Sequence, residues 1–115
     1  PVFVPLDIEI SVCVLAGYFR ADVKQALIAA FRGFFHPDNF TFGQPVFLSQ
    51  IYALAQSVAG VESVLVTRFQ RWGKTANQEL GKGVLTPAGL EIVRLDNDPN
   101  FPENGKLEWV MNGGL

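Results

Sequence analysis

The feature that most constrains the fold is a change of hydrophobic period within the first 36 residues. In LDIEISVCVLA, residues 6–16, the even-numbered positions from Leu6 to Val14 are apolar, while the odd-numbered ones are mostly polar or small. A period of two is typical of a strand with one buried face. In ADVKQALIAAFRGFFH, residues 21–36, apolar positions recur at steps of four and three instead. This spacing predicts an amphipathic helix that ends before Pro37.

A second helical pattern and three strand patterns follow. Residues 49–60 have an apolar stripe of helical spacing, with Ser49 as the expected N-cap and Gly60 as the expected stop. Three later segments are rich in β-branched and aromatic residues and predict strands, at residues 61–72, 90–96 and 106–112. No helix separates these three strands, so they should pair antiparallel. We therefore expect an α+β fold, a two-layer sandwich with a mainly antiparallel sheet of about four strands and two helices on one face, in the order strand-helix-helix-strand-strand-strand.

This arrangement predicts which side chains form the core. Leu27 and Phe31 of the first helix should be buried with Ile51 and Leu54 of the second. They should pack on the apolar face of the first strand, which carries Ile8, Ile10 and Val12.

Size and composition limit the possible classes of function. A chain of 115 residues is one domain, and it can bury roughly 65% of the surface that its unfolded form exposes. The net charge of −2 provides no basic field for phosphate, so we expect no nucleic-acid partner. No apolar run approaches 18 residues, so we expect no membrane insertion. Cys13 is the only cysteine, which excludes an internal disulfide. The start at Pro1, without a methionine, suggests that residues 1–115 are a single domain from a longer protein.

The segment LDNDPNFPENG, Leu95–Gly105, has two interpretations. Its polar residues at every second position resemble the start of a calcium loop, but such a loop needs glycine at its sixth position and glutamate at its twelfth. Phe101 and Leu107 occupy these positions. Two prolines and an Asn-Gly pair instead favour an ordered turn. We predict a hairpin connection between strands 90–96 and 106–112, with no metal bound.

No other motif supports catalysis or cofactor binding. Gly73-Lys74-Thr75 lacks the earlier glycine and the following helix of a phosphate loop. His36 is the only histidine, so the usual zinc ligands are missing. Asp7 and Glu9 should lie on the solvent face of the first strand. We therefore predict that the chain is not an enzyme and has no catalytic, cofactor-binding or metal residues.

The long segment Gly73–Gly89 has no period and contains four glycines, which predicts a loop. Its second half is nevertheless apolar. We predict that it is mobile in the isolated chain and packs on a neighbouring subunit. The candidate interface residues are Trp72, Leu80, Val84 and Leu85.

The segment EIVRLDNDPNFPENGKLEWVMNGGL, Glu91–Leu115, resembles the ending of putative baseplate assembly proteins of bacteria and phages, which belong to the baseplate J-like family. The earlier segments VPLDIEISVCV and FGQPVFLSQIYALAQSVAGVESVLVTRFQRW, with the glycine-rich loop, are similar to the last domain of that family, so that the resemblance covers nearly the whole chain. Family members are several times longer, which fits a C-terminal fragment.

The resemblance implies a structural role in the baseplate of a contractile tail, in a phage virion or a phage-like particle assembled in the bacterial cytoplasm. It implies wedge and ring assembly through contacts with other baseplate wedge proteins and with copies of itself. The alternative is a ferredoxin-like module that binds a small ligand or regulates an attached enzyme, because a fold alone does not determine function. A pocket lined by polar groups would favour this alternative, whereas a flat apolar surface or strand edges open to a neighbouring chain would favour the structural role.

Overall fold

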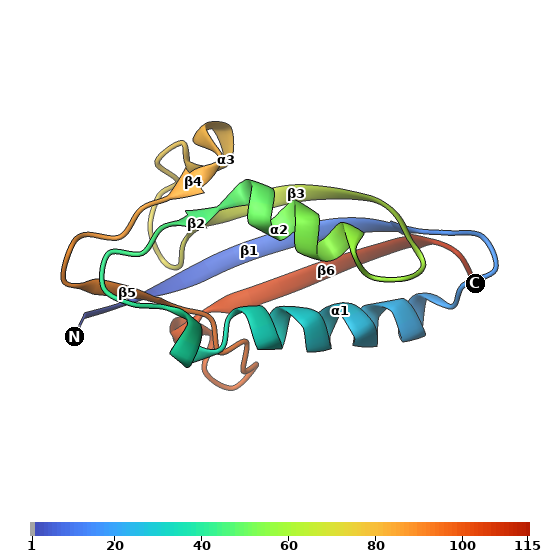
Figure 1. The fold of residues 1–115 in the computed structure, drawn as a ribbon, viewed down its shortest axis with the longest axis horizontal. Coiled ribbons are helices and arrows are strands. Elements are labelled where there is room, and N and C mark those ends of the chain that lie inside the picture. Colours follow the sequence, from blue (N-terminus) through green and yellow to red (C-terminus); the bar gives the residue numbers. More distant parts are fainter. Residues whose placement is uncertain (1) are drawn as a thin grey trace.

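The computed structural model describes residues 2–115 and contains a mixed sheet with three α-helices (Figure 1). In chain order the elements are β1 (Val2–Val14), α1 (Arg20–Phe34), β2 (Val46–Phe47), α2 (Leu48–Gln56), β3 (Val61–Arg71), α3 (Glu79–Lys82), β4 (Val84–Leu85), β5 (Glu91–Arg94) and β6 (Lys106–Gly113). One-turn 3-10 helices form at Pro37–Asn39 and Pro102–Asn104. The expected α+β class is confirmed. No helix formed by residues 2–115 combines the length and the apolar character that crossing a bilayer requires.

The long strand β1 is the centre of the main sheet. β3 pairs with it antiparallel on one side. On the other side β5 pairs with Val2–Pro5 and β6 pairs with Asp7–Val14, and both run parallel to β1. The predicted mainly antiparallel sheet is therefore wrong, because two of the three pairings to β1 are parallel. The three strands that were expected to pair with one another, β3, β5 and β6, each pair with β1 instead. The two edges of β1 are long enough to hold all three.

The predicted hairpin between the last two strands is wrong for the same reason. β5 and β6 follow each other along one edge of β1 in the same direction, so they cannot pair as a hairpin. Leu95–Gly105 leaves this edge and returns to it. Its base is closed by the Asp96 amide donating to the Asn104 carbonyl and by the Asn97 amide donating to the Gly105 carbonyl, each at 3.1 Å. The segment is an ordered turn, as predicted, but it interrupts one row of pairing.

Gly105 makes this return possible. Its φ is 109°, and a Cβ at this position would lie 2.6 Å from the Arg94 carbonyl oxygen and 2.7 Å from the Leu95 Cα. Only glycine permits so close an approach of two backbones. The turn can therefore return beside Arg94 and Leu95 only because residue 105 is a glycine.

The prediction of Gly73–Gly89 as a loop without regular structure is also wrong. It contains α3 and β4, and β4 pairs antiparallel with β2. Leu85 is in the core, at 1% exposure, and is paired with Val46. The burial of Leu85 therefore explains part of the apolar character of the second half of Gly73–Gly89.

The two longer helices begin and end close to the predicted positions. α2 begins one residue before Ser49, so Ser49 lies in its first turn and is not the N-cap. The Phe47 amide donates instead to the Gln50 Oε1 atom at 3.0 Å, which satisfies a main-chain donor at the helix start. Gly60, the expected stop, lies beyond the helix end with a φ of 92°.

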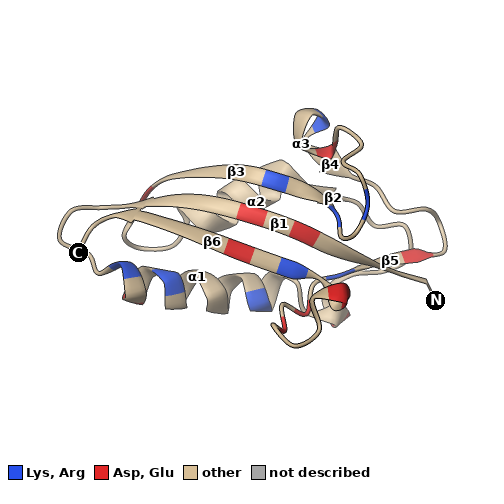
Figure 2. Cartoon of the chain, turned by 180° about the vertical axis from the view of Figure 1, so that it is seen from behind, with Lys and Arg blue, Asp and Glu red and all other residues tan. Residues whose placement is uncertain are grey.

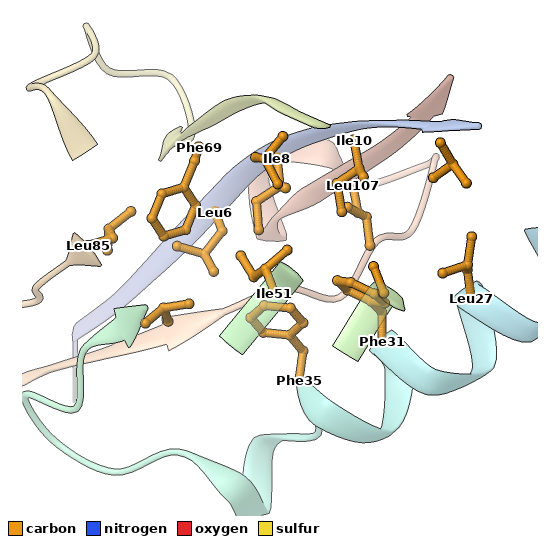
Figure 3. Packing of buried hydrophobic residues seen from close by; sticks show 14 of the residues in the cluster. Leu6, Ile8, Ile10, Leu27, Phe31, Phe35, Ile51, Phe69, Leu85 and Leu107 are labelled. Atoms are coloured by element: carbon orange, nitrogen blue, oxygen red, sulfur yellow. The ribbon is translucent and has the colours of Figure 1, made fainter. Parts of the chain in front are cut away.

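The core lies between β1 and the helices α1 and α2. All even-numbered side chains of β1 from Val4 to Val14 are buried, which confirms the predicted face. Figure 3 shows Ile8 and Ile10 directed toward Ile51 of α2 and Phe31 of α1. Leu27, Phe31 and Ile51 are buried as predicted, whereas Leu54 is only half-buried. Burial of each such side chain stabilises the fold by roughly 1.5–3 kcal/mol relative to exposure.

Candidate protein interface

The face of the sheet opposite the core carries the odd-numbered side chains of β1. Asp7, Glu9, Ser11 and Cys13 are partly exposed there. The pairing register aligns them with side chains of β3 and β6, which point the same way. Figure 2 shows this face, with α2 behind the sheet and acidic residues on β1 and β6 close to a basic residue on β3. We call it the open face.

One end of the open face is an ion-pair cluster around Arg68. The Arg68 Nε atom lies 2.7 Å from the Asp7 Oδ1 atom, and the Nη2 atom lies 3.0 Å from the Glu108 Oε1 atom. Nη1 lies 3.6 Å from the Glu9 Oε2 atom. Lys106 Nζ adds a second cation, 2.7 Å from the Glu108 Oε1 atom. Asp7 and Glu9 are on the solvent face, as predicted, but they hold a guanidinium that joins all three strands.

These contacts shift the ionisation of their members. The pKa of the Glu108 carboxyl is lowered, first by the hydrogen bond from Lys106, which outweighs the opposing effect of burial, and further by the charge of Arg68. Burial alone would lower the pKa of the Arg68 guanidinium, but the hydrogen bond to Asp7 and the surrounding carboxylates raise it. Both shifts favour the charged forms of Glu108 and Arg68, and the ion pairs link the three strands at this end.

The middle of the open face is apolar. Leu65 of β3 and Val110 of β6 both align with Ser11 of β1, one on each side. They are 60% and 44% exposed, so they are largely left uncovered by residues 2–115. Strands are spaced about 4.8 Å apart, which places the two side chains about 10 Å from each other across the small Ser11. The result is a flat apolar centre next to a charged cluster.

The far end of the open face carries the single thiol. Cys13 Sγ donates to the Glu62 Oε2 atom at 3.4 Å. This hydrogen bond, together with desolvation and the Glu62 charge, raises the pKa of the Cys13 thiol. A raised pKa keeps the sulfur in its weakly nucleophilic thiol form at neutral pH.

The four predicted interface residues do not form the open face. Trp72 is half-buried just after β3, where its amide donates to the Pro5 carbonyl at 2.9 Å. Leu80 of α3 is 39% exposed, and Val84 of β4 is half-buried. Leu85 is in the core and offers no surface to a partner. Leu80 is thus the most accessible of the four.

A pocket of about 260 Å³ lies near the start of β1, beside β5. Phe3, Phe35 and Phe40 contribute aromatic walls. Its charged groups are Arg94 and Asp96, and they bind each other, with 2.8 Å between the Arg94 Nη2 and Asp96 Oδ2 atoms. The pocket is mostly apolar, and its polar groups are already paired.

The turn Leu95–Gly105 uses its polar side chains on its own backbone. The Asn97 Oδ1 atom accepts the Leu107 amide at 3.0 Å, and the Asp98 Oδ1 atom accepts the Asn100 amide at 2.9 Å. Asp96 is held by Arg94. Among residues 2–115, no group of three or more His, Cys, Asp or Glu side chains is arranged to hold a metal ion.

Arg68, Leu65 and Val110 were not predicted as site residues. β3 has register shifts against β1 between Glu9 and Ile10 and between Cys13 and Val14. Each shift inserts an extra residue in β3 and reverses the faces of the residues beyond it. Simple alternation along residues 61–72 therefore could not assign these side chains to a face. For β6, alternation from Leu107 would have placed Val110 outside.

A scan of the chain against models of known protein families finds no family whose model matches. A search among curated proteins finds no significant match either.

Proposed function

We propose that this chain is a structural component of a contractile-tail baseplate and that it assembles through protein–protein contacts. In this proposal it is a two-layer α+β module that presents the open face of its sheet to other wedge proteins or to copies of itself. It belongs to the baseplate of a phage virion or phage-like particle, assembled in the bacterial cytoplasm. The resemblance of Glu91–Leu115 to the family ending supports the class of assembly.

The observation that carries the proposal is the exposed apolar centre of the open face. Leu65 and Val110 lie on a flat sheet surface without a covering helix, and the Arg68 cluster adjoins them. Protein interfaces commonly combine an apolar centre with a polar rim. Covering Leu65 and Val110 would remove apolar surface from water, while the charged cluster would determine the orientation of the partner.

The test changes this centre in the protein as it is produced in the bacteria that make the particle. The double variant Leu65→Asp, Val110→Asp should melt within a few degrees of the parent, because both side chains are exposed. Particles should lack baseplates, as seen by electron microscopy of negatively stained lysates. The control Gln25→Glu adds a negative charge on exposed α1 surface and should leave assembly intact. Normal baseplates in the double variant would contradict the proposal.

The second candidate function is binding of a small ligand. The pocket beside Phe3 and Phe40 is the observation in its favour, but its 260 Å³ is slightly below the usual size of ligand sites. Its charged pair, Arg94 and Asp96, would have to separate before binding a polar ligand. Mass spectrometry of an extract from the purified, denatured chain distinguishes the two functions: a stoichiometric small molecule would favour the ligand-binding module over the structural role.

A further inference from the structure

The outer edge of β6 is open over a short stretch and closed at both ends. Backbone groups of alternate residues in a strand point to opposite sides. The Leu107 amide points away from β1, because it donates to the Asn97 Oδ1 atom at 3.0 Å. The Gly113 carbonyl also points away, because it accepts a hydrogen bond from the Arg20 Nη1 atom at 3.0 Å. Trp109 and Met111 lie between these two positions with the same orientation.

The amide and carbonyl groups of Trp109 and Met111 therefore face outward from the sheet. In the part of the chain that the structure describes, no turn, loop or side-chain hydrogen bond reaches them. Asn97 closes one end of this row and Arg20 closes the other. The gap exposes two donors and two acceptors, arranged for a further strand.

The other outer edges are partly covered. The Val66 amide of β3 points away from β1 and donates to the Tyr52 hydroxyl of α2 at 2.9 Å. On β5, the Glu91 carbonyl accepts the Gly43 amide at 2.8 Å. The chain thus covers part of each of these edges from within and leaves the middle of β6 open. An unpaired strand edge is a template for another strand.

A groove of about 390 Å³ runs beside this gap, between α1 and β6. Lys24 and Ile28 of α1 line it opposite Leu107 and Trp109 of β6. Since Arg20, Lys24 and Ile28 are spaced four residues apart, they form one stripe of α1 along the edge of β6. Figure 2 shows α1 lying along β6, with basic positions in its ribbon.

The groove is lined by two charged side chains, Glu108 and Lys24, and only Glu108 has an ion-pair partner among residues 2–115. The Glu108 carboxylate also lines it, but Lys106 and Arg68 bind that carboxylate on the open face. Among residues 2–115, no salt bridge engages Lys24. The groove therefore presents one free cation beside apolar walls.

We propose that the edge of β6 between Leu107 and Gly113 accepts one extended segment of another polypeptide, which adds as a short strand. The segment places an acidic side chain opposite Lys24 and a small apolar side chain against Ile28 and Trp109. This mode of recognition takes affinity from main-chain hydrogen bonds and selectivity from alternate side chains. The inference goes beyond the proposed baseplate role and does not depend on it.

The geometry favours a single strand over a second copy of the domain. From residue 108 to residue 112 the open stretch of β6 spans about 13 Å, at a rise of about 3.3 Å per residue, which suits a segment of about five residues. α1 runs along one side of this edge, and the turn that carries Asn97 and Pro99 closes one end. A second sheet would have to fit its own helix into the same space.

In the test, the additional strand is fused to the chain after Leu115. Leu115 lies beside the Gly113 end of β6, because its amide donates to the Tyr18 carbonyl at 2.8 Å. A flexible linker of about eight Gly and Ser residues followed by Thr-Glu-Thr-Val-Thr can return along the β6 edge, at an effective concentration of about 1 mM, with Glu and Val two residues apart and therefore on the same face of the added strand. Two matched fusions carry Thr-Lys-Thr-Val-Thr and Thr-Pro-Thr-Pro-Thr, the second with proline at both positions whose amides face β6. The Pro fusion cannot donate the required hydrogen bonds.

Amide hydrogen exchange measured by NMR gives the readout at Trp109 and Met111. We expect at least tenfold slower exchange in the Glu fusion than in the Pro fusion, with a smaller effect in the Lys fusion. Equal exchange in the Glu and Pro fusions would overturn strand addition. Equal protection by the Glu and Lys strands would overturn the role of Lys24. Protection already present in the unfused chain, together with a dimer in analytical ultracentrifugation, would show that a second copy occupies the edge instead.

Discussion

Leu27→Ala tests the assignment of α1 to the core. The Leu27 side chain is fully buried, at 0% exposure, and it faces the even-numbered side chains of β1 in Figure 3. Truncation removes buried methyl groups and leaves a cavity in a close-packed interior, which costs about 2–5 kcal/mol in the free energy of unfolding. The unfolding entropy of a 115-residue domain is about 0.24 kcal/mol per kelvin, so the melting temperature should fall by about 8–20 °C.

Calorimetry and urea denaturation measure this effect independently. The urea midpoint should fall while the slope m stays constant, because the variant buries nearly the same surface. Lys24→Ala, one turn earlier on the same helix, is the control and should change the free energy by no more than about 0.5 kcal/mol, as usual for surface substitutions. Equal losses in the two variants would refute the helix phase, and a loss below about 1 kcal/mol for Leu27→Ala would refute its place in the core.

Three further predictions concern the turn and the ion-pair cluster. Gly105→Ala should lower the free energy of unfolding by more than about 1 kcal/mol, because alanine is strained at this φ and meets the Arg94 carbonyl; a melting temperature unchanged in calorimetry would contradict the close approach. Arg68→Met should destabilise the fold at pH 7 by about 1 kcal/mol, because it removes the cation that Asp7, Glu9 and Glu108 contact; an unchanged urea midpoint would contradict the cluster. The pKa of Glu108 is lower in the folded state, so its stabilisation is present above pH 4.5 and is lost as the pH falls through the folded-state value. Acid titration of Glu108→Gln should therefore show a smaller loss of stability below pH 4.5 than the parent, and an identical loss would exclude this contribution.

Local patterns predicted those parts of the fold that depend on one element at a time. The alternation in residues 6–16 identified the buried face of β1, and the helical stripe identified Leu27 and Phe31 as core residues. Ile51 followed from the second stripe. Each of these predictions depends only on the geometry of an isolated helix or strand, which the backbone repeats determine.

Strand pairing was not predictable in this way. The sequence order of the strands suggested that consecutive strands pair, whereas β5 and β6 both return to β1 and run parallel to it. The open face was missed because residues 61–71 contain two extra residues relative to β1. Such shifts appear only when two strands are aligned with each other, so the exposure of Leu65 could not be derived from its neighbours in the chain.

The sequence by itself determined the class of fold, the identity of the main helices, the buried face of the central strand and the turn at Leu95–Gly105. The tertiary structure alone decided which edges of β1 are used and in which direction, that Leu85 belongs to the core, and that Arg68 joins three strands. The physical reason is the range of the interactions. Helix stripes, caps and turns arise from residues a few positions apart, whereas sheet register and ion-pair clusters depend on contacts between distant segments that form only when the whole core is packed.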